Sequence, residues 1–205
     1  MEENNWKVGI LLFDEVELLD FAGPFEVFSV TTEKNGHKPF DVCTVSQKGI
    51  MITARNGLKV QPDYSIDDFP KVDILVVPGG LGAREYEIHN DILINWIKEQ
   101  MKQVKIMTSV CTGALLLAKA GLLEGKKATT HWASIERFRN EFPYVDVKEN
   151  IKFVDEGNIV TSGGISAGIN MSFHIITRLL GIEIAQRTAK IMEYDINFPL
   201  HKVTI

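Results

Sequence analysis

The sequence predicts an α/β fold of flavodoxin-like type, a three-layer sandwich whose mostly parallel central sheet lies between helices. Short apolar segments of strand length alternate along the chain with longer segments of helical periodicity, and this alternation is typical of βαβ units. Nearly continuous apolar runs such as residues 72–77 indicate strands that are buried on both faces, as in parallel sheets. Because the sequence has no internal repeat, linker or break in composition, we expect a single domain over residues 1–205.

The first half of the chain supplies most of the predicted sheet. In chain order it is predicted to form strand 7–13, helix 25–32, strand 40–46, hairpin 51–60, strand 72–77, helix 91–102, strand 104–109 and helix 112–120. Pro24 precedes the first helix at a position that proline favours. Asn56 and Gly57 stand between β-type residues and indicate the hairpin turn. Apolar side chains recur at helical spacing over 91–102 and so predict a helix with one buried face.

The second half continues the alternation with shorter extended pieces. It is predicted to form strand 128–130, helix 133–142, extended segments 145–148 and 151–154, strand 159–161, helix 165–180 and helix 182–194. Residues 155–158 have the composition of a turn. The helix over 165–180 is mostly apolar, and the one over 182–194 is more charged.

The composition is that of a soluble globular protein, with 205 residues, 45% hydrophobic and 24% charged residues and a formal net charge of −5. The acidic balance argues against a nucleic-acid partner. No segment has the length and hydropathy of a membrane span or an export signal, so we expect a cytoplasmic protein without a membrane partner. The histidines fit no metal-ligand spacing, and we expect neither a metal nor a cofactor.

Two cysteines occur, and they stand in different contexts. Cys111 lies where a predicted strand runs directly into a helix, followed by the small residues Gly113 and Ala114. This is the arrangement of a nucleophile elbow, in which a sharp turn raises the side chain above the sheet. The helix N-terminus favours thiolate over thiol, so we expect Cys111 to be reactive. Cys43 lies within a predicted strand, and we expect a small, inert core residue.

Two further segments follow strands at the same predicted edge of the sheet, where sites form in open parallel sheets. Gly79 and Gly80 end the strand over 72–77 and would let backbone N–H groups face a ligand. Asp20 lies between apolar residues just before the first predicted helix. It is expected either to cap that helix or to be a partly buried acid near the thiol, and the two roles are compatible.

Four motifs in order make the resemblance to a known family specific. They are LLFDEVELLDFAGP, PGG, SVCTGALLLAKAGLLEGKKATTHW and TSGGISAGIN. Together they resemble the ThiJ/PfpI superfamily of class I glutamine amidotransferase-like proteins. Within it they are most similar to the isocyanide hydratases and to the amidotransferase-like domains of some AraC-type regulators.

The resemblance implies roles for individual residues. Cys111 matches the nucleophile, Asp20 the acid that hydrogen-bonds to it, and Thr112 the threonine that follows the nucleophile in the hydratases. Gly80 matches the glycine whose N–H forms an anion-binding site together with the N–H of Thr112. The other positions implied to bind substrate lie in the PGG, TTHW and TSGG segments: Gly79, His131, Trp132, Gly164 and Ile165. A homodimer is implied as well.

The chain departs from the protease-like relatives directly after the nucleophile. They carry histidine there, whereas this sequence has Thr112, and His131 can replace that base only if the fold brings it to the thiol. The expected function is therefore a cysteine-dependent hydratase or hydrolase of a small electrophile, with isocyanide hydration to N-substituted formamides as the best match. The alternatives are an oxidative-stress sensor, a glyoxalase- or deglycase-like enzyme acting on reactive carbonyls, and an amidase- or protease-related member of the superfamily.

Overall fold

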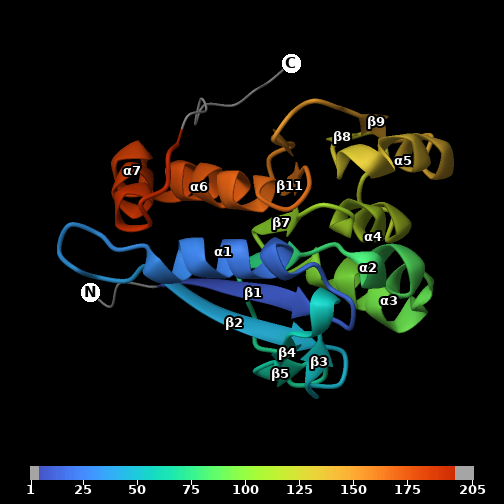
Figure 1. The fold of residues 1–205 in the computed structure, drawn as a ribbon, viewed down its shortest axis with the longest axis horizontal. Helices are drawn as coiled ribbons and strands as arrows, with labels where there is room; N and C mark the ends of the chain where they lie inside the picture. The colour runs from blue at the N-terminus through green and yellow to red at the C-terminus, as the bar shows by residue number, and fades with distance from the viewer. Residues whose placement is uncertain (1–4, 197–205) are drawn as a thin grey trace.

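A seven-stranded sheet forms the centre of the computed structural model, which describes residues 5–196 of the chain (Figure 1). Its strands are β1 (Trp6–Leu12), β2 (Phe40–Ser46), β5 (Tyr64–Ser65), β6 (Ile74–Val77), β7 (Ile106–Ser109), β10 (Phe153–Asp155) and β11 (Ile159–Ser162). They pair in the order β10-β11-β7-β6-β1-β2-β5. Every pair in this sheet is parallel except β10–β11. The predicted α/β fold with a mostly parallel sheet is confirmed.

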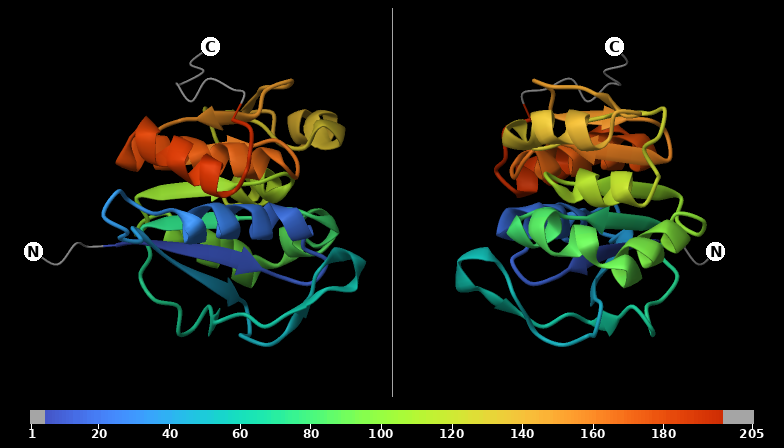
Figure 2. Two further views of the ribbon diagram at one scale, coloured as in Figure 1. Left: turned by 60° about the vertical axis from the view of Figure 1, so that its left-hand side comes forward. Right: turned by 90° about the vertical axis from the view of Figure 1, so that its right-hand side faces the viewer.

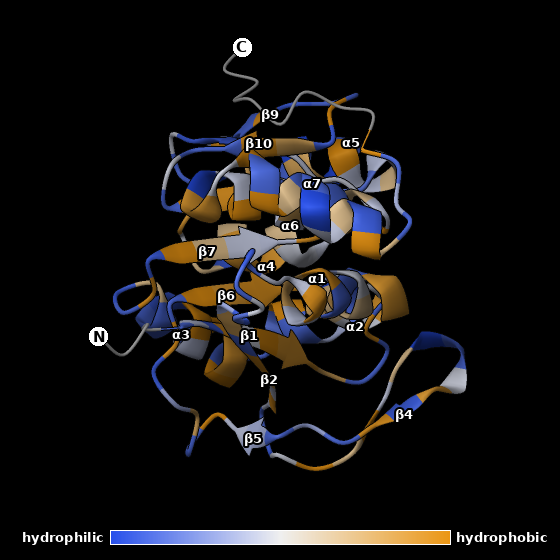
Figure 3. Cartoon of the chain, turned by 90° about the vertical axis from the view of Figure 1, so that its left-hand side faces the viewer, coloured by the Kyte–Doolittle hydropathy of each residue, from blue (hydrophilic) through white to orange (hydrophobic). Residues whose placement is uncertain are grey.

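The central strands are buried on both faces, as their apolar sequences predict. All residues of β6 and β7 are buried, and β6 and β1 have the orange colour of hydrophobic residues in Figure 3. Because such strands offer no polar face to water, helices must cover the sheet on both sides.

Two groups of helices provide this cover. One group consists of α1 (Leu18–Val30), α6 (Ala167–Leu180) and α7 (Ile182–Ile191), which pack against one another. The other consists of α2 (Leu81–Glu85), α3 (Asp91–Gln100) and α4 (Gly113–Lys119), with the 3₁₀ turn η2 (Glu87–His89). Within the first group α1 and α6 approach closely, because a Cβ at Gly23 would lie 2.9 Å from Cγ1 of Ile169.

Two small units stand outside the main sheet. β3 (Ile52–Thr53) and β4 (Lys59–Val60) form the predicted hairpin, with the 3₁₀ turn η1 (Arg55–Gly57) at its tip, and the hairpin projects from the sheet (Figure 2). β8 (Lys127–Ala128) pairs with β9 (Asp146–Val147), and this pair lies with the 3₁₀ turn η3 (Trp132–Ser134) and α5 (Ile135–Glu141) beside β11 (Figure 1).

The start of α1 differs from the prediction. The helix begins at Leu18 rather than at residue 25, so Pro24 lies inside it and Asp20 in its first turn. Glu17 occupies the N-cap position, and Asp20 is therefore not the cap. Pro24 lacks the N–H that would bond the Asp20 carbonyl, but α1 buries Phe21, Val27 and Phe28, and this packing outweighs the lost bond.

No helix within residues 5–196 is long and apolar enough to cross a membrane.

Candidate active site

Backbone strain gathers at the carboxyl edge of the sheet. The four neighbouring strands β11, β7, β6 and β1 are each followed within a few residues by a positive φ, at Ile165 (55°), Cys111 (56°), Gly80 (125°) and Glu15 (60°). Only Gly80 adopts such a φ without steric cost, and a β-branched residue such as Ile165 does so rarely. Residues held in this region mark functional sites more often than chance, so the sheet edge is the candidate site.

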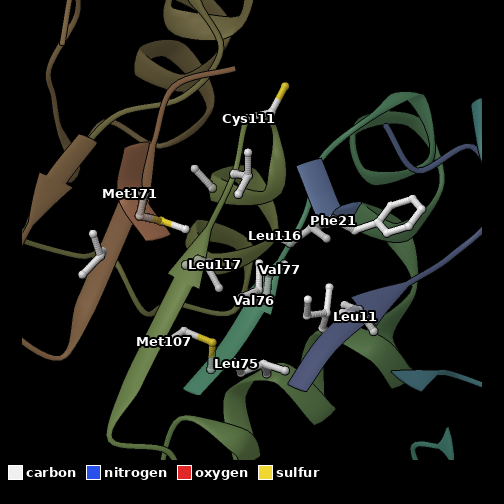
Figure 4. Close-up of a cluster of buried hydrophobic side chains, with 14 of the residues drawn as sticks. Leu11, Phe21, Leu75, Val76, Val77, Met107, Cys111, Leu116, Leu117 and Met171 are labelled. Carbon is white, nitrogen blue, oxygen red and sulfur yellow. The ribbon is translucent and has the colours of Figure 1, made fainter. Parts of the chain in front are cut away.

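Cys111 forms the predicted elbow between β7 and α4. Its N–H donates to the Gly163 carbonyl at 3.1 Å, and its carbonyl accepts from the Thr130 hydroxyl at 2.8 Å, so neighbouring loops hold the strained backbone on both sides. Gly113 lets the turn close, because a Cβ there would collide with the Val77 carbonyl. The sulfur points beyond the end of the strand, away from the core cluster (Figure 4), and the residue is 6% exposed.

Asp20 reaches the same place from the first turn of α1. Its side chain is fully buried, and Oδ2 accepts a hydrogen bond from the Gly79 N–H at 3.0 Å. The Cys111 thiol and the Ile165 N–H also face this carboxyl group. The other carboxyl oxygen of Asp20, Oδ1, accepts no hydrogen bond of good geometry from the thiol, from the Ile165 N–H or from any other group among the described residues. The structure therefore brings the predicted acid and the predicted nucleophile together.

Burial controls the protonation of this pair. Burial raises the pKa of Asp20 from 3.8 to about 7, the Gly79 N–H opposes the rise, and the negative charge of Glu17 adds to it. Burial also raises the pKa of the Cys111 thiol, as does the negative charge of Asp20, against the N–H and hydroxyl of Thr112. We expected the helix N-terminus to favour the thiolate, but desolvation outweighs it here. The two groups share a buried site that retains a proton at neutral pH.

The N–H groups of the Gly79–Gly80 turn donate hydrogen bonds to side chains of the protein itself. The Gly80 N–H donates to the Thr112 hydroxyl at 2.9 Å, and that hydroxyl lies 3.2 Å from the Gly80 carbonyl, to which it donates. The Gly79 N–H donates to Asp20. Side chains of this protein therefore occupy the N–H groups of Gly79 and Gly80, whereas the Thr112 N–H, the other expected anion donor, faces the Cys111 sulfur. Gly79 has no room for a side chain, since a Cβ would overlap the Thr112 amide.

His131 lies beside the elbow but does not hydrogen-bond to the thiol. Its ring packs on Gly164, where a Cβ would collide with the imidazole, and its Nδ1 accepts from the Ala133 N–H at 3.3 Å. Burial and the charge of Arg84 lower the pKa of His131, while Glu17 raises it. The imidazole is therefore neutral at pH 7. Trp132 is 82% exposed, with its ring 5.6 Å from that of His131.

A cleft of about 490 Å³ opens next to the elbow. Its lining combines the Gly-Gly segment after β11 and the start of α6 with residues around β8 and η3, the start of α5 and the segment between β9 and β10: Thr129, Thr130, Trp132, Ile135, Glu149, Asn150, Ile151, Lys152, Gly163, Gly164 and Ala167. We call it the β8–η3 cleft. Of the predicted substrate-binding residues, Trp132 and Gly164 line it.

The sequence did not point to Glu17, whose charge acts on both Asp20 and His131. Its carboxylate lies 3.3 Å from the Arg55 guanidinium of η1, a contact between residues 38 positions apart. The available signal was its position three residues before Asp20, which places both on the first turn of one helix.

Cys43 lies half-buried in β2, away from this edge. Burial, with Asp63 and Asp41 adding, raises the pKa of its thiol to about 11. Cys43 packs against the core without being fully buried, and its low reactivity stays a prediction.

Comparisons with known proteins identify relatives over most of the chain. A model of the DJ-1/PfpI family matches residues 6–178. Isonitrile hydratase from Pseudomonas putida is 35% identical over 191 residues, which cover 92% of this chain and 78% of that protein. The HTH-type transcriptional regulator GbdR of Pseudomonas aeruginosa is 29% identical over 192 residues, and the chain spans about half (52%) of its length.

Solved structures share the fold. A ThiJ/PfpI family protein from Pseudomonas syringae superimposes with a TM-score of 0.80 and 24% identity, over 96% of this chain and 78% of that one. Drosophila melanogaster DJ-1beta gives a TM-score of 0.80 at 20% identity, over 93% of this chain and 99% of that one.

Proposed function

Since this chain belongs to the DJ-1/PfpI family, and since it pairs a buried cysteine with a buried carboxyl group, we propose that it is a cysteine-dependent hydratase that converts isocyanides to N-substituted formamides. The observation that carries the proposal is the Asp20–Cys111 pair. A carboxyl group whose pKa is raised to about 7 can donate a proton at neutral pH and then take one back.

The first step adds the sulfur of Cys111 and one proton to the terminal carbon of the isocyanide. The Cys111 sulfur attacks that carbon and forms a C–S bond, while Asp20 delivers the proton of the pair to the same carbon. The product is a thioimidate, R–N=CH–S–Cys, and Asp20 is left as a carboxylate. Nucleophile and acid must be adjacent for this step, and the structure has them so.

The second step adds water to the thioimidate carbon. The water oxygen bonds to that carbon and the Asp20 carboxylate accepts one of the water protons. The second water proton passes to the nitrogen, and the C–S bond breaks with its electron pair leaving on sulfur. The formamide R–NH–CHO leaves and the pair regains its proton. Thr112 keeps the Gly-Gly turn in register with the elbow through its hydroxyl, which is bonded to Gly80 at both backbone atoms.

The engaged glycine amides favour hydration over acyl transfer. An amidase or peptidase develops an oxyanion, which needs N–H donors aimed at it. Here the N–H groups of Gly79 and Gly80 bond Asp20 and Thr112, and His131 has no hydrogen bond to the thiol among the described residues. Isocyanide hydration builds its charge on carbon, so it requires neither feature. The similarity to an isonitrile hydratase supports the same choice.

The test is turnover of methyl isocyanide, with N-methylformamide measured by NMR. We expect Cys111→Ser to abolish formation of the product, because the covalent route has no other nucleophile. We expect Asp20→Asn to lower kcat by at least about 100-fold, the usual contribution of a general acid. Cys43→Ser is the matched control and should retain activity. Absence of formamide from the wild-type protein, or its formation by Cys111→Ser, would overturn the proposal.

A further inference from the structure

Another cavity opens at the opposite edge of the sheet from the candidate active site. It lies where the parallel strands β1, β6 and β7 begin, whereas the candidate active site lies where they end. Its volume is about 360 Å³, which is comparable with small-molecule sites in proteins. Its lining comes from the starts of these three strands: Asn5, Trp6, Lys7, Lys71, Val72, Asp73 and Lys105. We call it the lysine pocket.

Asp73 ties the walls of the lysine pocket together. Its carboxylate accepts the Lys7 N–H at 3.0 Å and lies 2.9 Å from the Lys105 ammonium. Its N–H donates to the Lys7 carbonyl at 2.8 Å, and its carbonyl accepts the Lys105 N–H at 2.7 Å. The Lys105 ammonium also lies 4.5 Å from the centre of the Trp6 ring, in a cation–π contact. The pocket is therefore preformed, and Lys105 already balances the charge of Asp73.

Two other lysines of the pocket have no ion-pair partner. Neither Lys7 nor Lys71 forms an ion pair within residues 5–196, and both are exposed to solvent. Asp41, the neighbour of Lys7 on β2, does not line the pocket, and its carboxylate accepts from the Asn5 amide at 3.0 Å. The whole chain has a formal net charge of −5, so this concave group of ammonium ions stands out from it. Such a place attracts an anion.

One residue of the pocket also has an unsatisfied acceptor. The Oδ1 atom of Asn5 is buried and accepts no hydrogen bond from the residues that the structure describes. Its amide nitrogen, in contrast, donates to Asp41. Buried polar atoms in proteins nearly always have a partner. A hydroxyl group of a bound molecule would supply the donor that Asn5 lacks.

We propose that the lysine pocket binds a phosphate monoester of a small hydroxyl-bearing molecule, the chemistry of a sugar phosphate. A phosphate monoester carries close to two negative charges at pH 7, so one group can contact both Lys7 and Lys71. Lysine binds phosphate as a point charge and does not need the fixed fork of an arginine. A hydroxyl group of the organic part donates to Asn5. The proposal is independent of the proposed hydratase activity, which uses the other edge of the sheet.

The experiment is isothermal titration calorimetry of the full chain near pH 7 at low ionic strength, with ribose 5-phosphate, methyl phosphate and sulfate as probes. We expect ribose 5-phosphate to bind at least about fivefold more tightly than methyl phosphate, because only the sugar offers a hydroxyl to Asn5. Asn5→Ala should remove that difference. Lys7→Ala and Lys71→Ala should each weaken ribose 5-phosphate binding by roughly fivefold, the contribution of one exposed charge pair, and Lys71→Arg should retain it.

Lys59→Ala is the matched control. Lys59 is an exposed lysine of β4, in the hairpin that contacts residues 15 and 16 at the other edge of the sheet. Its removal changes the net charge equally and should leave binding unchanged. Absence of ribose 5-phosphate binding, or binding insensitive to Lys7→Ala and Lys71→Ala, overturns the proposal. Sulfate or methyl phosphate bound as tightly as ribose 5-phosphate would identify an adventitious ion only and overturn it too. Each of these results leaves the proposed hydratase function standing.

Discussion

Asp20 and Cys111 titrate as a coupled pair, because both are buried and each shifts the pKa of the other. Thiolate with carboxylic acid, the reactive arrangement, contains one proton, as does thiol with carboxylate. Acidification adds a second proton and traps the unreactive thiol–acid form. Since the pKa of Asp20 is raised to about 7, the singly protonated pair forms as the pH rises through that value.

We therefore expect kcat/KM for isocyanide hydration to rise with pH and to level off above an apparent pKa of about 7. The measurement is a pH–rate profile at low substrate concentration from pH 5 to pH 9 in buffers of constant ionic strength. An ordinary carboxyl group would place this rise near pH 4. A profile that is flat between pH 5.5 and 8.5 would contradict the assignment.

The same buried carboxyl group makes folding depend on pH. Its pKa is 3.8 in its ordinary state and about 7 in the folded protein, so between these values the folded state binds more protons than the unfolded state. Its contribution to the free energy of unfolding is fully present below pH 3.8 and is lost as the pH rises through 7. The loss is on the order of 4 kcal/mol at most, from about 1.4 kcal/mol per pKa unit.

Asp20→Asn should remove this fall in the free energy of unfolding at high pH. The amide oxygen can still accept from the Gly79 N–H, and no charge is buried. We expect the variant to be more stable than the wild type at pH 8 by about 1–4 kcal/mol, and the difference to shrink toward pH 5. Urea denaturation at the two pH values measures it. A variant that is less stable than the wild type at pH 8 would show that the pKa of Asp20 is not raised toward 7 in the folded protein.

At the scale of the elements, the elbow depends on contact between β6 and the start of α4. Gly113 lies where a Cβ would collide with the Val77 carbonyl. We expect Gly113→Ala to lower the free energy of unfolding by about 1–3 kcal/mol, the cost of overpacking. Gly163→Ala is the control, because its Cβ would meet its nearest neighbour at 3.5 Å, an ordinary contact. Equal denaturation midpoints for the two variants would contradict the packing described for the elbow.

Elements with a strong local pattern were predictable. β2 has the predicted bounds, 40–46, and the strand-to-helix junction at Cys111 is confirmed, because continuous apolar runs and small residues specify them locally. The start of α1 was not predicted, since Pro24 is the strongest local start signal and only packing of the preceding turn overrides it. β5 was missed for a related reason: its two residues are a strand only because they pair with β2.

At the scale of the whole molecule, sequence reasoning predicted that the candidate residues meet at one edge of the sheet, but it did not predict their hydrogen bonds. Parallel strands end at one edge, so residues following β6 and β7 had to meet there. The bond from Gly79 to Asp20 joins residues 59 positions apart, and that from Gly80 to Thr112 joins residues 32 positions apart. Which N–H groups remain available depends on such distant partners, and no local pattern encodes them.

An apolar surface next to the candidate site is the physical reason to retain the homodimer that the family resemblance implies. Leu18, Leu19 and Phe25 on α1 are each 37% exposed, and Ile165 beside Asp20 is 38% exposed. Large exposed side chains of this kind mark interaction surfaces when they gather on one face. In a two-fold dimer each substitution occurs twice across the interface, which doubles its effect.

We therefore predict that the protein sediments at micromolar concentration with twice the 23.0 kDa mass of the chain, and that Phe25→Glu shifts it toward the monomer. Because an unpaired carboxylate in the interface loses its hydration, dissociation should become easier by at least roughly 100-fold. Ile92→Glu is the control, since Ile92 is 59% exposed on α3, which packs with α4 rather than with α1. A wild-type monomer would overturn the dimer, and a Phe25→Glu dimer as tight as the control would move the interface away from α1.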